Sequence, residues 1–197
     1  MENQMGVGIL VIFGVLTMGL LQVHVEGADP DLVTDFDAVA GDKLDGNSFT
    51  FTGFRGVIGG LGYPFTSHSN SNSSTGVFKV SKASVVEFPG LSGLGVSYAL
   101  LQFGPDSVNP PHQHPRASEI LLVIQGSLTV GFVDTTNTLF NNTLHSGDMF
   151  VFPKGMVHFQ INFHKSKSAL AIGAFGGANP GTVSLPSTLF GSGIPDD

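Results

Sequence analysis

The sequence predicts an all-β domain, built as a β-sandwich or a jelly-roll barrel. From Val77 onwards, short apolar runs alternate with clusters of Gly, Pro, Asn and Asp, which is typical of strands joined by tight turns. No stretch after residue 46 that is longer than one turn has the periodicity of an amphipathic helix. The composition agrees, because 27 Gly and 17 Phe accompany only 12% charged residues, which favours a packed β protein over a disordered chain.

Residues 1–27 predict a secretory signal peptide. Met5–Leu21 is an apolar run, and the small residues Gly27 and Ala28 follow it at the expected cleavage site. The alternative is an uncleaved membrane anchor, because the run approaches the length that spans a bilayer. Cleavage would remove two Glu and no Lys or Arg, so the formal charge would change from −7 to −7 + 2 = −5. The chain has no Cys, so in an oxidising compartment its stability must come from packing, metal binding or assembly.

Residues 28–76 predict an N-terminal arm and a polar loop. Ala28–Gly46 is acidic and irregular, whereas Asn47–Gly62 alternates Phe with small residues and offers one further candidate strand. Ser67–Gly76 is polar, low-complexity sequence of the kind found in surface loops. Two sequons predict N-glycosylation, one at Asn72 and one at Asn141.

Residues 77–197 are expected to form the β domain itself. Gly126-Ser127 is predicted to be a two-residue hairpin connection and Asp134–Asn142 a polar loop. Both faces of Glu119–Ile124 are apolar apart from Glu119, which predicts a strand covered on both sides. The predicted strands are Val77–Val80, Ala83–Phe88, Val96–Phe103, Glu119–Gln125, Leu128–Val133, Asp148–Phe152, His158–Phe163 and Ala169–Phe175.

The charge pattern argues against a nucleic-acid partner. The formal net charge is −7 and no Lys/Arg-rich run occurs anywhere in the chain. After signal cleavage we also expect no membrane association, so the expected ligand is a small molecule or ion.

Two histidines and a carboxylate lie close together between Pro110 and Glu119. His112 and His114 are one residue apart, so on an extended segment their side chains point the same way. Pro110 and Pro111 stiffen the backbone in front of them, which lowers the entropy lost in aiming the imidazoles. Glu119 opens the next predicted strand. This ligand set suits Zn, Mn, Fe or Cu but needs at least one more donor.

His158 is the predicted further ligand. It lies on one face of its strand with Gln160 and Asn162, and the opposite face is apolar. The polar face is therefore expected to line the interior of the domain, where His158 would complete the site begun by His112 and His114. The other histidines are interpreted as surface or hydrogen-bonded residues: His24, His68, His145 and His164.

The spacing of these residues resembles the two motifs of the cupin superfamily. The surrounding sequence is similar to plant germin-like proteins, densely over Phe88–Asp197 and loosely over Ala28–Gly76. The first motif, H-x-H-x4-E-x6-G, is fitted by His112, His114, Glu119 and Gly126, and the second, G-x5-P-x-G-x2-H-x3-N, by Gly147, Pro153, Gly155, His158 and Asn162.

The resemblance implies a single cupin jelly-roll barrel in the apoplast or cell wall, assembled into a homo-oligomer that is a hexamer in the family. It also implies Mn(2+), held by the residues that match His112, His114, Glu119 and His158. Ligand chemistry alone is less decisive, because Cu or Zn would bind such a set more tightly than Mn(II). This sequence differs from the family pattern at two places that matter for assembly. Asp37 stands where the family has the first of two cysteines, and the sequence ends at Asp197, where the family continues into C-terminal helices that are missing here.

The resemblance leaves three functions open. The first is superoxide dismutation that produces hydrogen peroxide, with Asn109, Gln160 and Asn162 as donors that line the pocket or hold the ligands. The second, oxalate oxidation, is disfavoured, because Asn109 matches one of two pocket asparagines but the other aligns with Ala99, which cannot donate a hydrogen bond. The third is a non-catalytic metal-binding wall protein, acting as a receptor or as a nutrient-reservoir-type protein.

Overall fold

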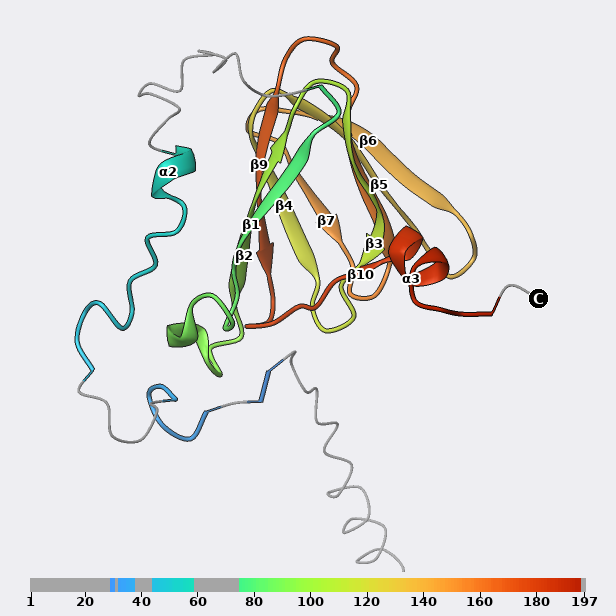
Figure 1. The fold of residues 1–197 in the computed structure, drawn as a ribbon. Helices are drawn as coiled ribbons and strands as arrows, with labels where there is room; N and C mark the ends of the chain where they lie inside the picture. The colour runs from blue at the N-terminus through green and yellow to red at the C-terminus, as the bar shows by residue number, and fades with distance from the viewer. Residues whose placement is uncertain (1–28, 31, 38–43, 59–74, 196–197) are drawn as a thin grey trace, which may run out of the picture.

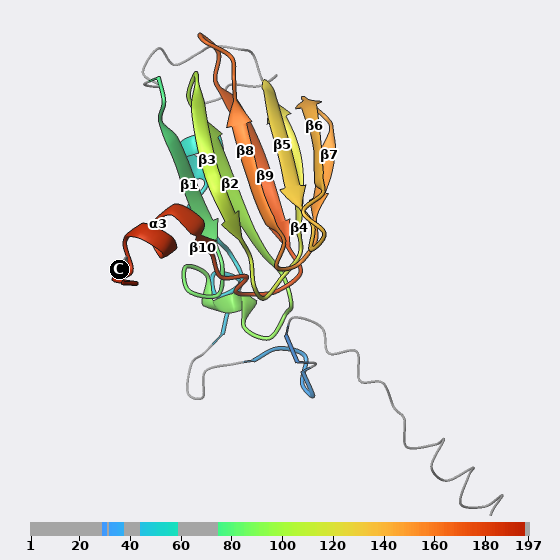
Figure 2. The same cartoon turned by 90° about the vertical axis from the view of Figure 1, so that its right-hand side faces the viewer.

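Two five-stranded antiparallel sheets face each other as two layers in the computed structural model, which describes residues 29–30, 32–37, 44–58 and 75–195 (Figure 1). The strand order is β1-β2-β9-β4-β7 in the first sheet and β10-β3-β8-β5-β6 in the second (Figure 2). This arrangement confirms the predicted all-β jelly-roll fold. The elements are α2 (Arg55–Ile58), β1 (Phe78–Ala83), the 3-10 turn η2 (Pro89–Leu91), β2 (Ser97–Phe103), β3 (Ser107–Gln113), β4 (Glu119–Gln125), β5 (Ser127–Val133), β6 (Leu139–His145), β7 (Met149–Phe152), β8 (Val157–Asn162), β9 (Ala169–Phe175), β10 (Val183–Ser184) and α3 (Leu185–Phe190).

The hydrophobic core lies between the sheets. Alternate residues of each strand point inward, so Leu121 and Val123 of β4 meet Leu128 and Val130 of β5, all of them nearly inaccessible to solvent. Burying one such side chain contributes about 1.5–3 kcal/mol. Phe152 of β7 joins the same core cluster, beside the polar interior described below.

The outer face of β4 corrects one prediction. Ile120 is 41% exposed, and Leu122 and Ile124 are half-buried, so this strand is covered on its inner face only. The apolar outer positions of β4 misled the prediction because in a single strand they look the same as core positions. Only the placement of the second sheet shows which face is covered.

The predicted hairpin at Gly126-Ser127 is wrong. β4 pairs with β7 and β9, whereas β5 pairs with β6 and β8, so the chain crosses at Gly126 from one sheet to the other. Gly126 has a φ of 83°, and a Cβ there would lie 2.7 Å from the Ser168 carbonyl oxygen. A sharp bend with φ > 0 between two strands fits a hairpin and a crossing equally well, which explains the error.

The expected loop over Asp134–Asn142 is a shorter turn over residues 134–138, and its second part is strand. The chain reverses within four residues, where Asp134 accepts hydrogen bonds from the amides of Thr136 and Thr138. β6 begins directly afterwards and pairs with β5 over its whole length. Asn141 is therefore an exposed strand residue opposite Gly131, and Asn72 of the other sequon lies outside the described residues.

Two further predicted strands are wrong. Ala83–Phe88 leaves the sheet after Ala83, because the Ser84 amide and hydroxyl both donate to the Glu87 carboxylate and close a turn. The described part of Asn47–Gly62 forms turns and the short helix α2. The expected signal peptide lies outside the described residues. Within the described ranges, no helix has the length and apolarity needed to cross a bilayer.

The described parts of the N-terminal arm contact the β domain at several points. Phe51 stacks on Phe88 with ring centroids 5.6 Å apart. Asp37, where the resemblance led us to expect a cysteine, accepts a hydrogen bond from the Ser92 hydroxyl at 2.8 Å. Asp29 accepts one from the Ala178 amide at 2.6 Å. The arm is therefore tied to the domain by polar and aromatic contacts instead of a disulfide.

The sequence did not predict β3, β10 or α3, and β3 proves important for the site. β3 contains Pro110 and Pro111, and its register against β8 shifts between Asn109 and His112. Proline donates no ladder hydrogen bond, so a Pro-Pro pair argues against a strand unless a bulge accommodates it, as here. The shift brings His112 directly opposite His158.

Candidate metal centre

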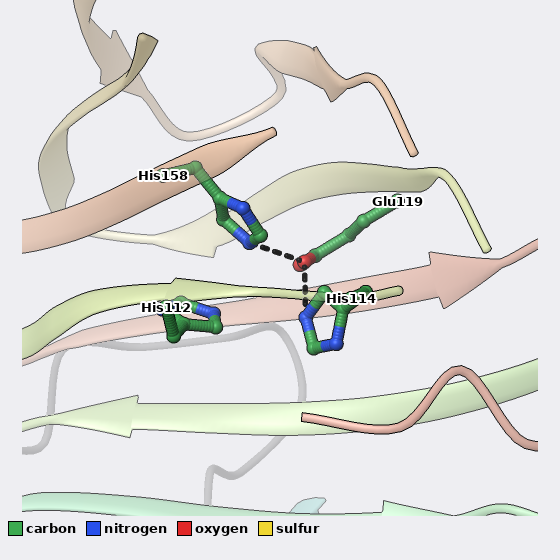
Figure 3. A group of neighbouring side chains, drawn as sticks. All are labelled: His112, His114, Glu119 and His158. Atoms are coloured by element: carbon green, nitrogen blue, oxygen red, sulfur yellow. Dashed lines mark ion pairs between the residues drawn. The ribbon is translucent and has the colours of Figure 1, made fainter. Parts of the chain in front are cut away.

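Four buried side chains converge between the two sheets. His112 lies on β3, His114 directly after it, His158 on β8 and Glu119 at the start of β4, and one donor atom of each lies within 4.8 Å of the others (Figure 3). The three imidazoles therefore come from the second sheet or its continuation, and the carboxylate from the first. This is the arrangement that the sequence predicted for these four residues.

Each imidazole has its Nδ1 atom against a backbone carbonyl. The distances are 2.8 Å from His112 to Pro110, 2.8 Å from His158 to Met156 and 2.5 Å from His114 to Gly181. A carbonyl only accepts, so each Nδ1 must carry the proton, which leaves the lone pair of a neutral ring on Nε2. Such a second hydrogen bond is what fixes the tautomer of metal-binding histidines.

The Nε2 lone pairs face a carboxylate. Glu119 Oε2 lies 3.2 Å from His114 Nε2 and 3.4 Å from His158 Nε2, the contacts dashed in Figure 3. With neutral rings these atoms offer lone pairs to one another and no proton, and His158 Nε2 and both Glu119 oxygens have no hydrogen-bond partner. Glu119 has no Lys or Arg ion-pair partner among the described residues. A cation bound among these atoms would satisfy all of them, so the residues fit a metal ion.

Aromatic rings and one glycine hold the donors in place. Phe152 stacks on His158 with centroids 4.4 Å apart, and Phe175 packs edge-on to His114 at 4.8 Å. Gly173 of β9 lies against Glu119, where a Cβ would be 2.6 Å from Oε1. The carboxylate can occupy this position only because residue 173 has no side chain.

Burial and neighbouring charge shift two pKa values in this cluster. Burial lowers the pKa of His112 to about 4, and His158 and His114 add to that shift. Burial raises the pKa of Glu119, but when His114 and His158 carry a proton on Nε2, their hydrogen bonds and charge lower it further, to about 2. At neutral pH His112 is therefore neutral and Glu119 ionised, which are the protonation states that ligate a metal.

Asn109 and Gln160 lie beside the cluster, as expected for pocket donors. The Asn109 side-chain amide donates to Gln160 Oε1 at 2.7 Å and lies 3.5 Å from His112 Nε2. Gln160 is fully buried, and its Nε2 has no partner. A buried amide with free N–H groups next to a metal site can donate to a ligand bound there.

Asn162 lies at the other end of β8 and hydrogen-bonds only to backbone. Its side-chain amide donates to the carbonyls of Gly104 and Lys167, and its oxygen accepts from the His164 amide. His164 and His145 lie outside the cluster: the His164 ring accepts from backbone amides and His145 is exposed. His24 and His68 fall outside the described residues.

A cavity of about 210 Å³ adjoins the cluster. Its lining includes Lys82 of β1, Glu87 of the turn that follows β1, and residues 179–182. The inner lining, apart from the cluster itself, includes Asn109 and the apolar side chains of Ala99, Leu101, Phe78 and Phe175. Ala99 thus lies in the cavity, as its alignment with a pocket asparagine implied.

Sequence reasoning missed the groups that orient the four donors. The carbonyls of Met156 and Gly181 carry no signature, because every residue has a carbonyl. Gly173 and Phe175 belong to a strand that was predicted, but its register against Glu119 becomes visible only in the folded chain. Phe152 was predicted as a strand residue, and its stacking on His158 was not.

Comparison with known proteins identifies the family. The sequence model of the Cupin family matches residues 65–196. A putative germin-like protein 9-2 of Oryza sativa subsp. japonica is 50% identical over 175 residues, covering 87% of this chain and 77% of the relative. Germin-like protein subfamily T member 2 of Arabidopsis thaliana is 45% identical, covering 84% of this chain and 74% of the relative.

Solved structures agree with this assignment. A structure of oxalate oxidase superposes with a TM-score of 0.64 at 36% sequence identity, covering 86% of this chain and 87% of that one. Oxalate oxidase in complex with the substrate analogue glycolate superposes equally well, covering 85% of this chain and 87% of that one at 36% identity. Together with the two motifs and the jelly-roll fold, these matches show that the chain belongs to the germin-like proteins of the cupin family.

Proposed function

We propose that His112, His114, Glu119 and His158 bind one manganese(II) ion, and that the loaded protein dismutates superoxide. The observation that carries the proposal is the convergence of four donor atoms within 4.8 Å, among which His158 Nε2 and both Glu119 oxygens have no hydrogen-bond partner. Three neutral imidazoles and one carboxylate leave a divalent ion with a local charge near +1, which attracts small anions. When bound, manganese supplies a one-electron redox couple.

The residues around the ion would bind and orient the anion. The overall reaction takes two superoxide ions and two protons to one dioxygen and one hydrogen peroxide. Asn109 and the free Nε2–H groups of Gln160 supply hydrogen-bond donors beside His112. The apolar cavity walls at Leu101 and Phe175 limit the water around the site, which strengthens these interactions.

The test is metal content and activity measured on the same purified protein. We expect one manganese per chain and superoxide dismutation in the natural sequence, and loss of both in His112→Ala. His145→Ala is the matched control, because His145 is an exposed histidine outside the cluster. Dismutation that survives unchanged in His112→Ala would contradict the proposal.

Oxalate oxidation is a second candidate, favoured by the structural similarity to oxalate oxidase and by Asn109 in the cavity. Ala99, 5% exposed in the same cavity, offers no donor to a second carboxylate, so we rank this activity lower. Peroxide release from oxalate measures it directly. If the natural sequence lacks it and Ala99→Asn gains it, the ranking stands, whereas strong release by the natural sequence reverses the ranking. A loaded protein with neither activity would be a non-catalytic binding protein.

The resemblance and the N-terminal run also support export to the apoplast, occupancy of the sequons and assembly as a homo-oligomer. These belong to the same proposal. The mass of the exported protein in solution, measured with and without deglycosylation, tests all three.

A further inference from the structure

His114 differs from the other two imidazoles in where its carbonyl partner comes from. His112 and His158 each donate to the carbonyl two residues earlier in the chain. His114 donates to Gly181, which lies 67 residues later in the chain. The tautomer and ring orientation of His114 therefore depend on the segment from residue 178 to 182 keeping its position.

Arg116 holds that segment. Its Nε donates to the Asn179 carbonyl at 2.8 Å and its Nη2 to Asn179 Oδ1 at 2.9 Å, while its backbone amide donates to the Pro180 carbonyl at 3.2 Å. The guanidinium also lies against the Cα of Gly181, because a Cβ there would be 2.8 Å from Nη2. Gly181 has a φ of 67°, so the loop winds tightly around the arginine.

We propose that Arg116 is a positioning residue for the metal ligand His114, acting through Asn179 and Gly181. The inference rests on the metal centre of the proposed function. The planar guanidinium donates to two oxygens of Asn179 from a fixed fork and lays a flat face over Gly181, a geometry that the compact ammonium of lysine does not have. Without it the Gly181 carbonyl moves, His114 Nδ1 loses its acceptor, and the ring populates the tautomer with a proton on Nε2. That tautomer has no lone pair on Nε2, the atom of His114 that faces Glu119, so it cannot ligate a metal through that atom.

Other contacts of the same segment keep the fold independent of Arg116. Ala178 is tied to Asp29, and β10 pairs with β3 through Val183 and Ser184. The Arg116 side chain is itself exposed. Its replacement should therefore leave the domain folded and change the environment of His114.

The experiment uses the full exported chain as Arg116→Lys and Asn179→Ala, with Arg55→Lys as the matched control. Arg55 is the only other arginine in the sequence and lies exposed on α2. Nitrogen-15 NMR of the imidazoles in the metal-depleted protein reports which ring nitrogen of His114 carries the proton. Manganese affinity is measured from the EPR signal of free Mn(II) during titration.

We expect both variants to lose the Nδ1–H form of His114 and to bind Mn(II) about 10-fold more weakly, the lower end of what losing such a hydrogen bond costs. Arg55→Lys should match the natural sequence, and the thermal midpoint of the metal-depleted protein should stay unchanged in all three. Variants that keep the Nδ1–H form and bind within twofold of the natural sequence would overturn the inference. Failure of the natural sequence itself to bind Mn(II) would overturn the proposed function instead, and the NMR result would still decide the role of Arg116.

Discussion

Each end of β8 carries a buried polar side chain, but the two side chains differ in whether their polar atoms have hydrogen-bond partners. His158 and Asn162 are both 1% exposed, share one face of the strand and point between the sheets. At one end all polar atoms of Asn162 are satisfied by the backbone of Gly104, His164 and Lys167. At the other end His158 Nε2 has no partner and faces Glu119. Burial of a polar residue therefore does not by itself indicate function, whereas burial without a partner does.

The largest expected effect is the loss of metal binding in His158→Ala. Removing a ligand should weaken Mn(II) binding beyond the 10- to 100-fold range typical of a lost outer hydrogen bond. Elemental analysis after dialysis measures this, with His145→Ala as control. The metal-depleted variant should unfold at nearly the natural midpoint, and retained manganese would remove His158 from the site.

At the opposite end, Asn162→Ala should cost about 3 kcal/mol of the free energy of unfolding, because it removes the three hydrogen bonds of a buried side chain. The Mn(II) content per folded chain should stay the same. Urea unfolding together with elemental analysis checks both. A variant that keeps its stability but loses manganese would show that Asn162 supports metal binding and not the stability of the fold.

The metal-depleted protein should lose stability in mild acid because of His112, which pairs with His158 across β3 and β8. The unfolded chain protonates His112 near pH 6.5, whereas the folded chain keeps it neutral down to about pH 4. The unfolded state then binds more protons, so the free energy of unfolding falls by about 2 kcal/mol from about pH 6 to about pH 4.5. Glu119, with its lowered pKa, adds to the loss only below about pH 4.5.

Denaturant titrations at several pH values, in the presence of a chelator, measure this dependence. The His112→Gln variant provides the comparison, since it should show a flatter profile in that window. Equal slopes for the variant and the natural sequence would assign the acid sensitivity to another group.

The smallest expected effect is at Gln160, midway between the two ends. Gln160→Leu removes a buried amide whose Nε2 is unpartnered, so the free energy of unfolding should change by no more than about 1 kcal/mol. Manganese content should persist, and dismutation per bound ion should fall about 10-fold. Stopped-flow decay of superoxide measures this rate. An unchanged rate would show that Gln160, like Asn162, contributes to the fold and not to the reaction.

The clustering of the candidate ligands was predictable because its signals are local. The alternation in β8 placed His158 inward, and the single-residue spacing placed His112 and His114 together. The path of the chain between those residues was harder to predict. The Pro-Pro pair concealed β3, and Gly126 looked the same whether the chain turned back or crossed to the other sheet. The contact between His114 and Gly181 spans 67 residues and uses only a carbonyl, so no residue pattern marks it.

The four donors are divided between the two layers of the domain, with Glu119 on one and the histidines on the other. Under the proposed assignment a bound ion cross-links those layers at their interior, and the layers cannot separate until its coordination breaks. Metal loading should then slow unfolding far more than it speeds refolding, because the donors meet only after the sheets have closed. The lifetime of the folded protein would then depend on metal supply as much as on its hydrophobic core.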